Sequence, residues 1–287
     1  MLTEHLFEQW HIDEEALLDA VRRGAGECDV FLGGSLADDL GNTGSDIDLY
    51  CFLDTPEPAS VGVGVTECGG ARVELHVVGT AAGSLIPDLT PLVSGSFPGR
   101  AQWPFIPEQF RRVVHALYRD RALARHPDGP AERLRRRTGA DLLHIHNALW
   151  ATAAVASLAE DAAALTGPDE SWSALYCARL AVEAALDAAL ACHMLVNPNP
   201  KWRVPLAFRA RLLDQAFPDP QQLLAGLFPD ASSFGTAVAA CLAATRRCLG
   251  VVTADAYLAS FDAVPDAAKQ YGVDTTGLAL WLPRDEP

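Results

Sequence analysis

Lysine is nearly absent from this chain of 287 residues, and arginine supplies almost all of the positive charge. Lys and Arg together number 22 against 37 Asp and Glu, so the formal net charge is −15. A large nucleic-acid surface needs clustered cations to contact phosphates. The charge balance therefore argues against extended nucleic acid as a partner.

Long apolar runs and paired-cysteine motifs are also missing. No uninterrupted apolar run reaches the roughly 18 residues of a membrane span, and the first residues lack the basic and apolar regions of a signal peptide. The seven cysteines are odd in number, and no two have CxxC spacing. We therefore expect reduced thiols, a cytoplasmic location and no membrane partner.

Two short motifs stand out against this background. They are Phe31-Leu32-Gly33-Gly34-Ser35 and Ser45-Asp46-Ile47-Asp48-Leu49. Residues i and i+2 of a strand point to the same face, so Asp46 and Asp48 project together while Ile47 and Leu49 face a core. Two adjacent carboxylates repel each other, so aiming both at one point calls for a cation. Paired hard oxygen ligands suit Mg²⁺.

A third acid follows in residues 72–78, where polar and apolar residues alternate as in a half-buried strand. Glu74 falls on the polar face of this strand, together with Arg72 and His76. If the strand pairs beside the one that carries Asp46 and Asp48, three acids converge. Three acids can hold two metal ions roughly 3.5–4 Å apart, the arrangement used in phosphoryl and nucleotidyl transfer.

This pattern resembles the nucleotidyltransferase superfamily, which includes the kanamycin and lincosamide nucleotidyltransferases. The family pattern is Gly-Ser, a short loop, Ser-Asp-x-Asp and a later strand with Asp or Glu. The residues that match it are Gly34-Ser35, Ser45-Asp46-Ile47-Asp48 and Glu74. The resemblance covers about residues 30–78.

The resemblance implies a role for each matching residue. Asp46, Asp48 and Glu74 would ligate magnesium, with two ions expected, and Glu74 would be the third ligand or the base that deprotonates the acceptor. The implied nucleotide-binding residues are Gly33, Gly34, Ser35, Ser45 and Lys201. Several relatives place a lysine of a helical second domain on the nucleotide phosphates, and Lys201 resembles it; a surface lysine in a Pro-rich turn is an equal alternative.

One departure and one cluster leave alternatives open. Many relatives carry Arg-Gly soon after Gly-Ser, where this chain has Asp38-Asp39. Either this loop points away from the phosphates or another cation replaces the arginine. Nine arginines lie between Arg111 and Arg137. We favour a solvated helix face paired with acids such as Glu132 and Asp120 over a positive wall above a triphosphate.

The expected fold class is α/β (α+β), a small mixed-sheet nucleotidyltransferase domain followed by an all-α bundle. The domain boundaries would be 1–105 and 106–287, the second domain covering nucleotide and acceptor. The expected strands are 28–33, 46–53, 61–65 and 72–78, with a Gly69-Gly70 hairpin turn. The expected helices are 4–23, 108–126, 131–165 with a break near Thr138-Gly139, 171–195 with Ser171 as N-cap, 205–216, 219–228, 231–250 and 253–263.

The function expected from the resemblance is Mg²⁺-dependent transfer of a nucleoside monophosphate. AMP from ATP is favoured, the acceptor is a hydroxyl or phosphate of an antibiotic or biosynthetic intermediate, and pyrophosphate is released. A homodimer is possible. Two alternatives stay open: nucleotidylation of a protein or tRNA in the manner of an antitoxin, and a non-catalytic member that binds nucleotide and regulates.

Overall fold

The computed structural model describes residues 7–8, 11–55, 61–92, 103–214, 216–229 and 233–251. These residues form two compact units. The first contains the described residues up to 92 together with 103–143 and 197–199, and the second contains 144–196 and the described residues from 200 onward. Each unit is described by itself.

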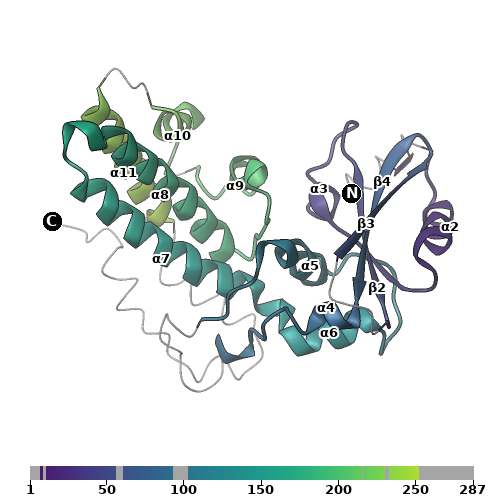
Figure 1. The fold of residues 1–287 in the computed structure, drawn as a ribbon. Helices are drawn as coiled ribbons and strands as arrows, with labels where there is room; N and C mark the ends of the chain where they lie inside the picture. Colours follow the sequence, from purple (N-terminus) through teal and green to yellow (C-terminus); the bar gives the residue numbers. More distant parts are fainter. Residues whose placement is uncertain are drawn as a thin grey trace. The chain divides into compact units, whose positions relative to one another are not determined.

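The first unit is built on a mixed five-stranded sheet (Figure 1). Its strands are β1 (Asp29–Leu32), β2 (Ile47–Leu53), β3 (Val61–Cys68), β4 (Ala71–Gly79) and β5 (Ala122–Ala124), in the order β3-β4-β2-β1-β5. The β2 and β4 strands are parallel and the other neighbours are antiparallel. This mixed sheet, together with the many helices, confirms the predicted α+β fold class.

The β3–β4 hairpin has the turn that its sequence predicts. Gly69 and Gly70 connect the strands with φ of 56° and 82°, the left-handed conformation that a two-residue hairpin turn requires at both positions. Consecutive glycines meet this requirement without steric cost. The hairpin places β4 between β3 and β2, beside the strand that carries the Asp-x-Asp motif.

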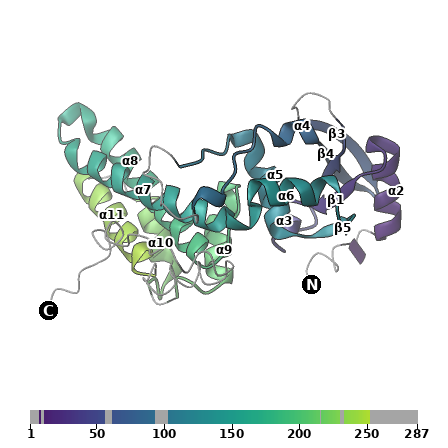
Figure 2. The same cartoon turned by 90° about the horizontal axis from the view of Figure 1, so that it is seen from below.

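One face of the sheet is covered by α2 (Glu14–Ala25), and the other by α4 (Thr80–Gly83), α5 (Glu108–Arg119) and α6 (Pro130–Thr138) (Figure 2). Leu17 and Val21 of α2 pack on alternate strand residues, which include Ile47 and Leu49. Both strand residues are fully buried. The expected alternation is therefore confirmed: the apolar residues of this motif enter the core, which leaves Asp48 on the opposite face.

Two helices of this unit differ from their predicted bounds. The helix predicted over 4–23 is interrupted, because Asp13 caps a new helix by accepting from the backbone N–H of Ala16; residues 1–6 and 9–10 lie outside the described residues. The helix predicted over 108–126 ends at Arg119. Asp120 has φ of 52°, and residues 122–124 then pair with β1. A left-handed residue ends the helix and frees the chain to extend.

The boundary between the units differs from the predicted domain boundary after residue 105. Residues 108–138 contain α5, β5 and α6, which contact β1 or β2 and so belong to the first unit. Asp29 of β1 holds α6 in place, because its buried carboxylate accepts from the backbone N–H groups of His126 and Ala131. The predicted functional division between a catalytic and a covering domain stays a prediction.

The second unit is helical. Its helices are α7 (Leu143–Ala164), α8 (Ser171–Cys192), α9 (Arg203–Arg209), α10 (Pro220–Leu227) and α11 (Phe234–Gly250). The α8 helix packs against α9, α10 and α11 and buries a row of alanines, as predicted for the centre of the bundle. Glu170, not Ser171, occupies the N-cap position of α8, because the 3₁₀ turn Pro168–Glu170 runs directly into the helix. The predicted helix 253–263 lies outside the described residues.

Only the helical segment Ala140–Ala164 passes a length-and-hydropathy test for a membrane span within the described residues. Its mean hydropathy reaches 1.2, and 50% of the tested window is buried inside the protein. The predicted break is present in front of it, since Gly139 has φ of 60° between α6 and this segment. A core helix of a soluble protein has the same properties, so the segment is weak evidence for a membrane; the cytoplasmic location stays a prediction.

Candidate functional site

The predicted pairing of the two acidic strands is confirmed. In the parallel register of β2 and β4, Asp48 lies opposite Glu74 and Tyr50 lies opposite His76. Side chains at opposed positions of neighbouring strands point to the same face. One ligand atom each from Asp48, Glu74 and His76 lies within 4.8 Å of the other two, and we call these three residues the strand cluster.

His76 is the buried member of the strand cluster. Its Nε2 lies 3.1 Å from Oδ1 of Asp48 and 3.8 Å from Oε2 of Glu74, and the residue is 7% exposed. The ring stacks on Tyr50, with centroids 4.6 Å apart and planes 12° from parallel. Burial, and next the negative Asp48, raise the pKa of Tyr50, so its phenol stays neutral. The alternating pattern of residues 72–78 placed His76 on the face of Glu74, but it did not assign His76 a role.

The two acids of the strand cluster remain accessible. Their side chains are 21% and 20% exposed. The Nη2 of Arg72 donates to Oε1 of Glu74 over 2.6 Å, but the Arg72 side chain is itself 56% exposed, so water screens this pair. Among the described residues, one histidine and one solvated arginine are therefore the basic groups that contact these two carboxylates.

The Gly33-Gly34 turn lies directly against the acidic strand. The N–H of Gly33 donates to the carbonyl oxygen of Asp48 over 2.8 Å. Gly34 has φ of 59°, and a Cβ at this position would overlap Oδ2 of Asp48. A Cβ on Gly33 would overlap the ring of Tyr50. Only glycines let the backbone approach this closely, which explains physically why the motif precedes the acids.

The other predicted site residues are placed as follows. Asp46 is exposed, directly precedes β2, and lies outside the strand cluster. Ser35 is half-buried in the short helix α3 (Gly34–Ala37). The hydroxyl of Ser45 accepts from the backbone N–H of Asn42 and closes the turn before β2. Lys201 is exposed in the second unit, with Nζ 5.1 Å from the centroid of the Trp202 ring. Of the three acids expected to converge, only Asp48 and Glu74 share the strand cluster. The metal role of Asp46 and the nucleotide-binding roles of the other residues stay predictions.

Asp38 and Asp39, the departure from the family pattern, are engaged by cations of the same unit. Asp38 is buried, with Nε of Arg119 at 2.8 Å and Nε2 of His115 at 3.3 Å, and it accepts from the amide of Asn197. Asp39 forms a bidentate pair with Arg121. We call Asp38, Asp39 and these partners the α3-end cluster. Its acids are neutralised within the fold, which favours the expectation that this loop points away from the phosphates.

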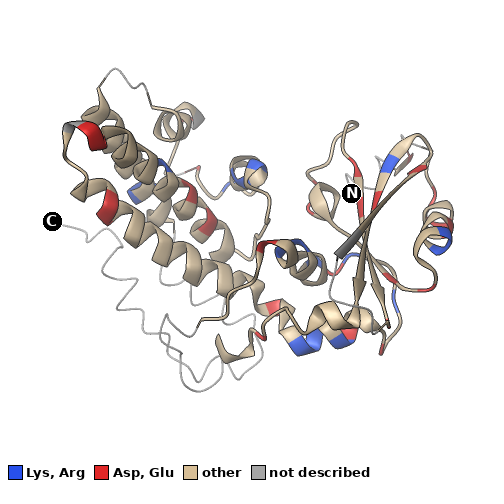
Figure 3. Ribbon diagram, viewed as in Figure 1, with Lys and Arg blue, Asp and Glu red and all other residues tan. Residues whose placement is uncertain are grey.

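Most arginines of the 111–137 cluster pair with acids, and α6 shows both charges close together (Figure 3). Arg125 pairs with Asp120 and Glu132, the two acids that the sequence singled out. The hydrogen bond from Arg125 lowers the pKa of Glu132. These ion pairs favour the predicted interpretation as a solvated, ion-paired face.

Arg112 differs from its neighbours on α5. Among the described residues it forms no ion pair with an acid, whereas Arg111 and Arg119 both do. Its positive charge opposes the rise in the pKa of Tyr50, the residue whose ring stacks on His76. It also precedes His115 by one helical turn, on the side of α5 that meets the α3-end cluster.

The strand cluster fits a divalent cation by the chemistry of its donors. Two carboxylates supply hard oxygen ligands, and an imidazole nitrogen faces both of them. Divalent cations in proteins are held by such sets, with water and substrate filling the remaining positions. The absence of a side chain at Gly34 lets the Asp48 carboxylate occupy the place that a Cβ would take.

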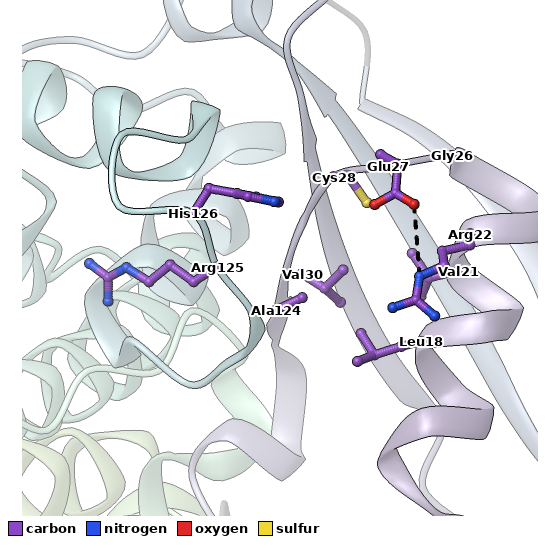
Figure 4. Close-up of a pocket in the computed structure, with 10 residues that line it drawn as sticks. All are labelled: Leu18, Val21, Arg22, Gly26, Glu27, Cys28, Val30, Ala124, Arg125 and His126. Atoms are coloured by element: carbon purple, nitrogen blue, oxygen red, sulfur yellow. Dashed lines mark ion pairs between the residues drawn. The ribbon is translucent and has the colours of Figure 1, made fainter.

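A separate cavity of about 170 Å³ lies on the α2 side of the sheet (Figure 4). Its lining includes Cys28, Val30, Arg22 and Glu27. The thiol of Cys28 is hydrogen-bonded to that of Cys51, which lowers the pKa of Cys28 and raises that of Cys51. All seven cysteines are free, as expected. The cavity contains no residue of the strand cluster.

Comparison with known proteins adds little to this geometry. No family model and no curated protein matches the chain. One solved structure that aligns with it is the crystal structure of a nucleotidyltransferase-like protein from Exiguobacterium sibiricum. The two sequences are 16% identical, the alignment covers 91% of this chain and 81% of that chain, and the TM-score is 0.44. At these values the likeness carries no argument about function.

Proposed function

We propose that the protein is a divalent-cation-dependent nucleotidyltransferase. It would transfer a nucleoside monophosphate, AMP from ATP in the favoured case, to a hydroxyl or phosphate of a small-molecule acceptor and release pyrophosphate. The observation that carries the proposal is the register of β2 and β4, which sets Asp48 opposite Glu74 directly against the Gly33-Gly34 turn. This arrangement agrees with the family pattern of the sequence.

In the proposed reaction the acceptor oxygen attacks the α-phosphorus of the nucleotide. A new O–P bond forms, and the bond from the α-phosphorus to the pyrophosphate oxygen breaks. A bound Mg²⁺ would neutralise charge on the α-phosphate and on the leaving pyrophosphate. Asp48 would hold the cation, and Asp46, which directly precedes β2, is the second acid that the proposal assigns to it.

Glu74 takes the proton of an acceptor hydroxyl and passes it to water. A general base must reach the proton it removes, and the Glu74 side chain is partly exposed and therefore accessible to an acceptor. Oε2 of this carboxylate faces the strand cluster, so Oε1, whose contact with the exposed Arg72 is open to exchange, is the oxygen that we assign to the proton. A phosphate acceptor needs no base to remove a proton. With such an acceptor, loss of Glu74 would lower the rate only by weakening the binding of the cation.

Arg112 is the cation that we assign to the nucleotide phosphates in place of the family arginine. It lies within electrostatic reach of Tyr50 and is not occupied by an acid among the described residues. Arginine binds phosphate by parallel N–H···O bonds. The acids Asp38 and Asp39 do not oppose this role, because Arg119, His115 and Arg121 already compensate them.

The acceptor class follows from charge. With a net charge of −15, the protein attracts cationic small molecules and repels polyanions at low ionic strength. A polycationic antibiotic such as an aminoglycoside therefore fits better than tRNA. Nucleotidylation of a protein remains a second outcome of the same assay.

The test is pyrophosphate release from each NTP with Mg²⁺ across a panel of acceptors, followed by mass spectrometry of the products. We expect Asp48→Asn and Glu74→Gln each to lower the rate about 10²–10³-fold, because each removes charge at the reacting centre. Asp19→Asn is the matched control, since Asp19 is an exposed acid of α2 on the far face of the sheet. Pyrophosphate release that survives Asp48→Asn would reject the site, and a labelled protein band would replace the small-molecule acceptor with a protein.

A further inference from the structure

We infer that His76 is a ligand of the cation itself, so that the strand cluster selects a first-row transition-metal dication such as Mn²⁺ over Mg²⁺. This inference deepens the proposed function, with which it shares its site, by naming the class of cation. The sequence pattern pointed to an all-oxygen site of acids, whereas the folded chain adds a nitrogen donor.

The three ligand atoms lie where one ion can contact all of them. Nε2 of His76 is 3.1 Å from Oδ1 of Asp48 and 3.8 Å from Oε2 of Glu74. Ligand atoms that each stand about 2.0–2.2 Å from one ion lie no more than roughly 4.4 Å apart. The 4.8 Å limit on the strand cluster is thus within a small side-chain rotation of a coordination sphere.

The imidazole is oriented before any ion binds. Stacking on Tyr50 fixes the plane of the ring, and burial keeps the rest of the side chain from turning into water. The nitrogen that faces the carboxylates is therefore held at the centre of the strand cluster. A histidine that only supported Asp48 would need contact with Asp48 alone, but this Nε2 approaches Glu74 as well.

The neighbours of the strand cluster leave its inner oxygens available. Arg72 contacts Oε1 of Glu74, while Oε2 faces His76. On the other side, Oδ2 of Asp48 packs against Gly34, in the place that a Cβ would take there, while Oδ1 faces His76. An entering ion therefore meets two carboxylate oxygens and one nitrogen, and water or a nucleotide phosphate can complete its shell.

The nitrogen decides the selectivity. Mg²⁺ prefers an octahedron of oxygen ligands and retains its waters. Imidazole suits first-row transition metals, whose affinity for mixed N/O sites exceeds that of Mg²⁺. Two carboxylates and one imidazole are therefore a set in which Mn²⁺, Co²⁺ or Zn²⁺ gains a bond that Mg²⁺ gains poorly.

The test uses Mn²⁺ alone as the probe on the full chain, without nucleotide. Electron spin-echo modulation of bound Mn²⁺ reports nitrogen nuclei in its first coordination shell. We expect modulation from one directly bound ¹⁴N in the wild-type protein. Bound Mn²⁺ without ¹⁴N modulation would overturn the inference, and this result requires no variant to fold.

His76→Gln separates a ligand from a hydrogen-bond donor. Glutamine keeps an N–H that can donate to Asp48 but is a poor metal ligand, so we expect the ¹⁴N signal to disappear and Mn²⁺ affinity, by calorimetry, to fall at least about tenfold. Mg²⁺ affinity should change by less than about threefold, because Mg²⁺ depends on the oxygens. His193→Gln at an exposed position after α8 is the control for adventitious binding, and loss of the signal in this variant instead would also overturn the inference.

The two proposals fail separately. Turnover with Mg²⁺ by a protein whose bound Mn²⁺ has no nitrogen ligand would refute the role of His76 and leave the nucleotidyltransferase standing. A nitrogen-ligated Mn²⁺ in a protein that releases no pyrophosphate with any acceptor would leave the cation site standing and refute the reaction.

Discussion

Two groups of acids lie at the two ends of the short helix α3, and they differ in how their negative charge is compensated. At the end of α3, Asp38 is buried against Arg119, His115 and Asn197. Against its beginning, Asp48 faces another acid, Glu74, across parallel strands. The first acid is surrounded by donors and cations of the protein, and the second is placed beside a like charge.

The difference shows how charge compensation separates structural acids from functional ones. A buried carboxylate is tolerated only when paired and hydrogen-bonded, and the α3-end cluster meets that condition with its own residues. The strand cluster has one histidine and one exposed arginine for two carboxylates. The missing charge is what a divalent cation would bring.

The largest effect on stability is expected from the α3-end cluster. Asp38→Asn should lower the free energy of unfolding by about 3–5 kcal/mol, because it leaves the largely buried guanidinium of Arg119 without its counter-ion. Urea denaturation measures the loss. Asp39→Asn is the matched control, since its pair with Arg121 is more exposed, and it should cost about 1 kcal/mol or less. Equal costs for the two variants would contradict the distinction between them.

A wild-type protein saturated with the cation should gain about 2.7 kcal/mol at 100 times the dissociation constant. The gain is expected only when the strand cluster is intact, because the ion binds the folded arrangement of Asp48 and Glu74. Thermal unfolding with Mn²⁺ and after removal of Mn²⁺ by EDTA measures it. The same gain in Asp48→Asn would place the stabilising ion elsewhere.

Gly34, the first residue of α3, lies directly against the Asp48 carboxylate. Gly34→Ala should cost about 1–2 kcal/mol for its left-handed backbone, and its Cβ would also displace the carboxylate of Asp48. Gly26→Ala is the matched control, because Gly26 has φ of 79° and no atom lies within 4 Å of the place that a Cβ would take there. We expect both variants to lose stability in denaturant, but only Gly34→Ala to lose cation affinity in calorimetry.

A variant of Arg112 tests whether this arginine of α5 binds the nucleotide phosphates. Arg112→Gln should raise the KM for the nucleotide about tenfold, about 1.4 kcal/mol of binding, with kcat and the free energy of unfolding little changed. Arg111→Gln on the same helix is the control, because Arg111 pairs with Glu108. A KM unchanged by Arg112→Gln would remove this residue from the nucleotide site.

The smallest expected effect is a gain in stability, opposite in sign to the loss expected for Asp38→Asn. In the absence of a divalent cation, Asp48→Asn should raise the free energy of unfolding by up to about 1 kcal/mol, because like charges opposite each other on neighbouring strands are destabilising. The change is measured by urea denaturation in EDTA. A loss comparable to that of Asp38→Asn would mean that Asp48 is a structural acid and would erase the contrast between the two clusters.

The strand alternation of the acidic motifs was predictable because it depends on local geometry. Ile47 and Leu49 had to face one side if Asp48 faced the other, and the Gly69-Gly70 turn indicated the hairpin whose second strand carries Glu74. The parallel pairing of that strand with β2 was a condition of the prediction, which the structure meets. The participation of His76 was not predictable at that level. Its role depends on the stack with Tyr50, a contact across two strands whose register the sequence pattern does not state.

The partners of Asp38 were not predictable from the sequence either. His115 and Asn197 are far from Asp38 along the chain, and both reach it only because α5 and the 197–199 segment pack in the same unit as the sheet. The end of α5 was misjudged for a related reason. The left-handed Asp120 and the pairing of residues 122–124 with β1 override the helical pattern of residues 108–126.

The chain alone determined the mixed-sheet fold, the strand that carries Asp48 and the hairpin that carries Glu74, because side-chain alternation and turn chemistry are local properties of a few consecutive residues. Only the tertiary structure decided which acids are neutralised and which are left facing each other. Compensation depends on atoms brought together from distant positions, and Coulomb interactions depend on their separation and burial, neither of which is written in sequence spacing.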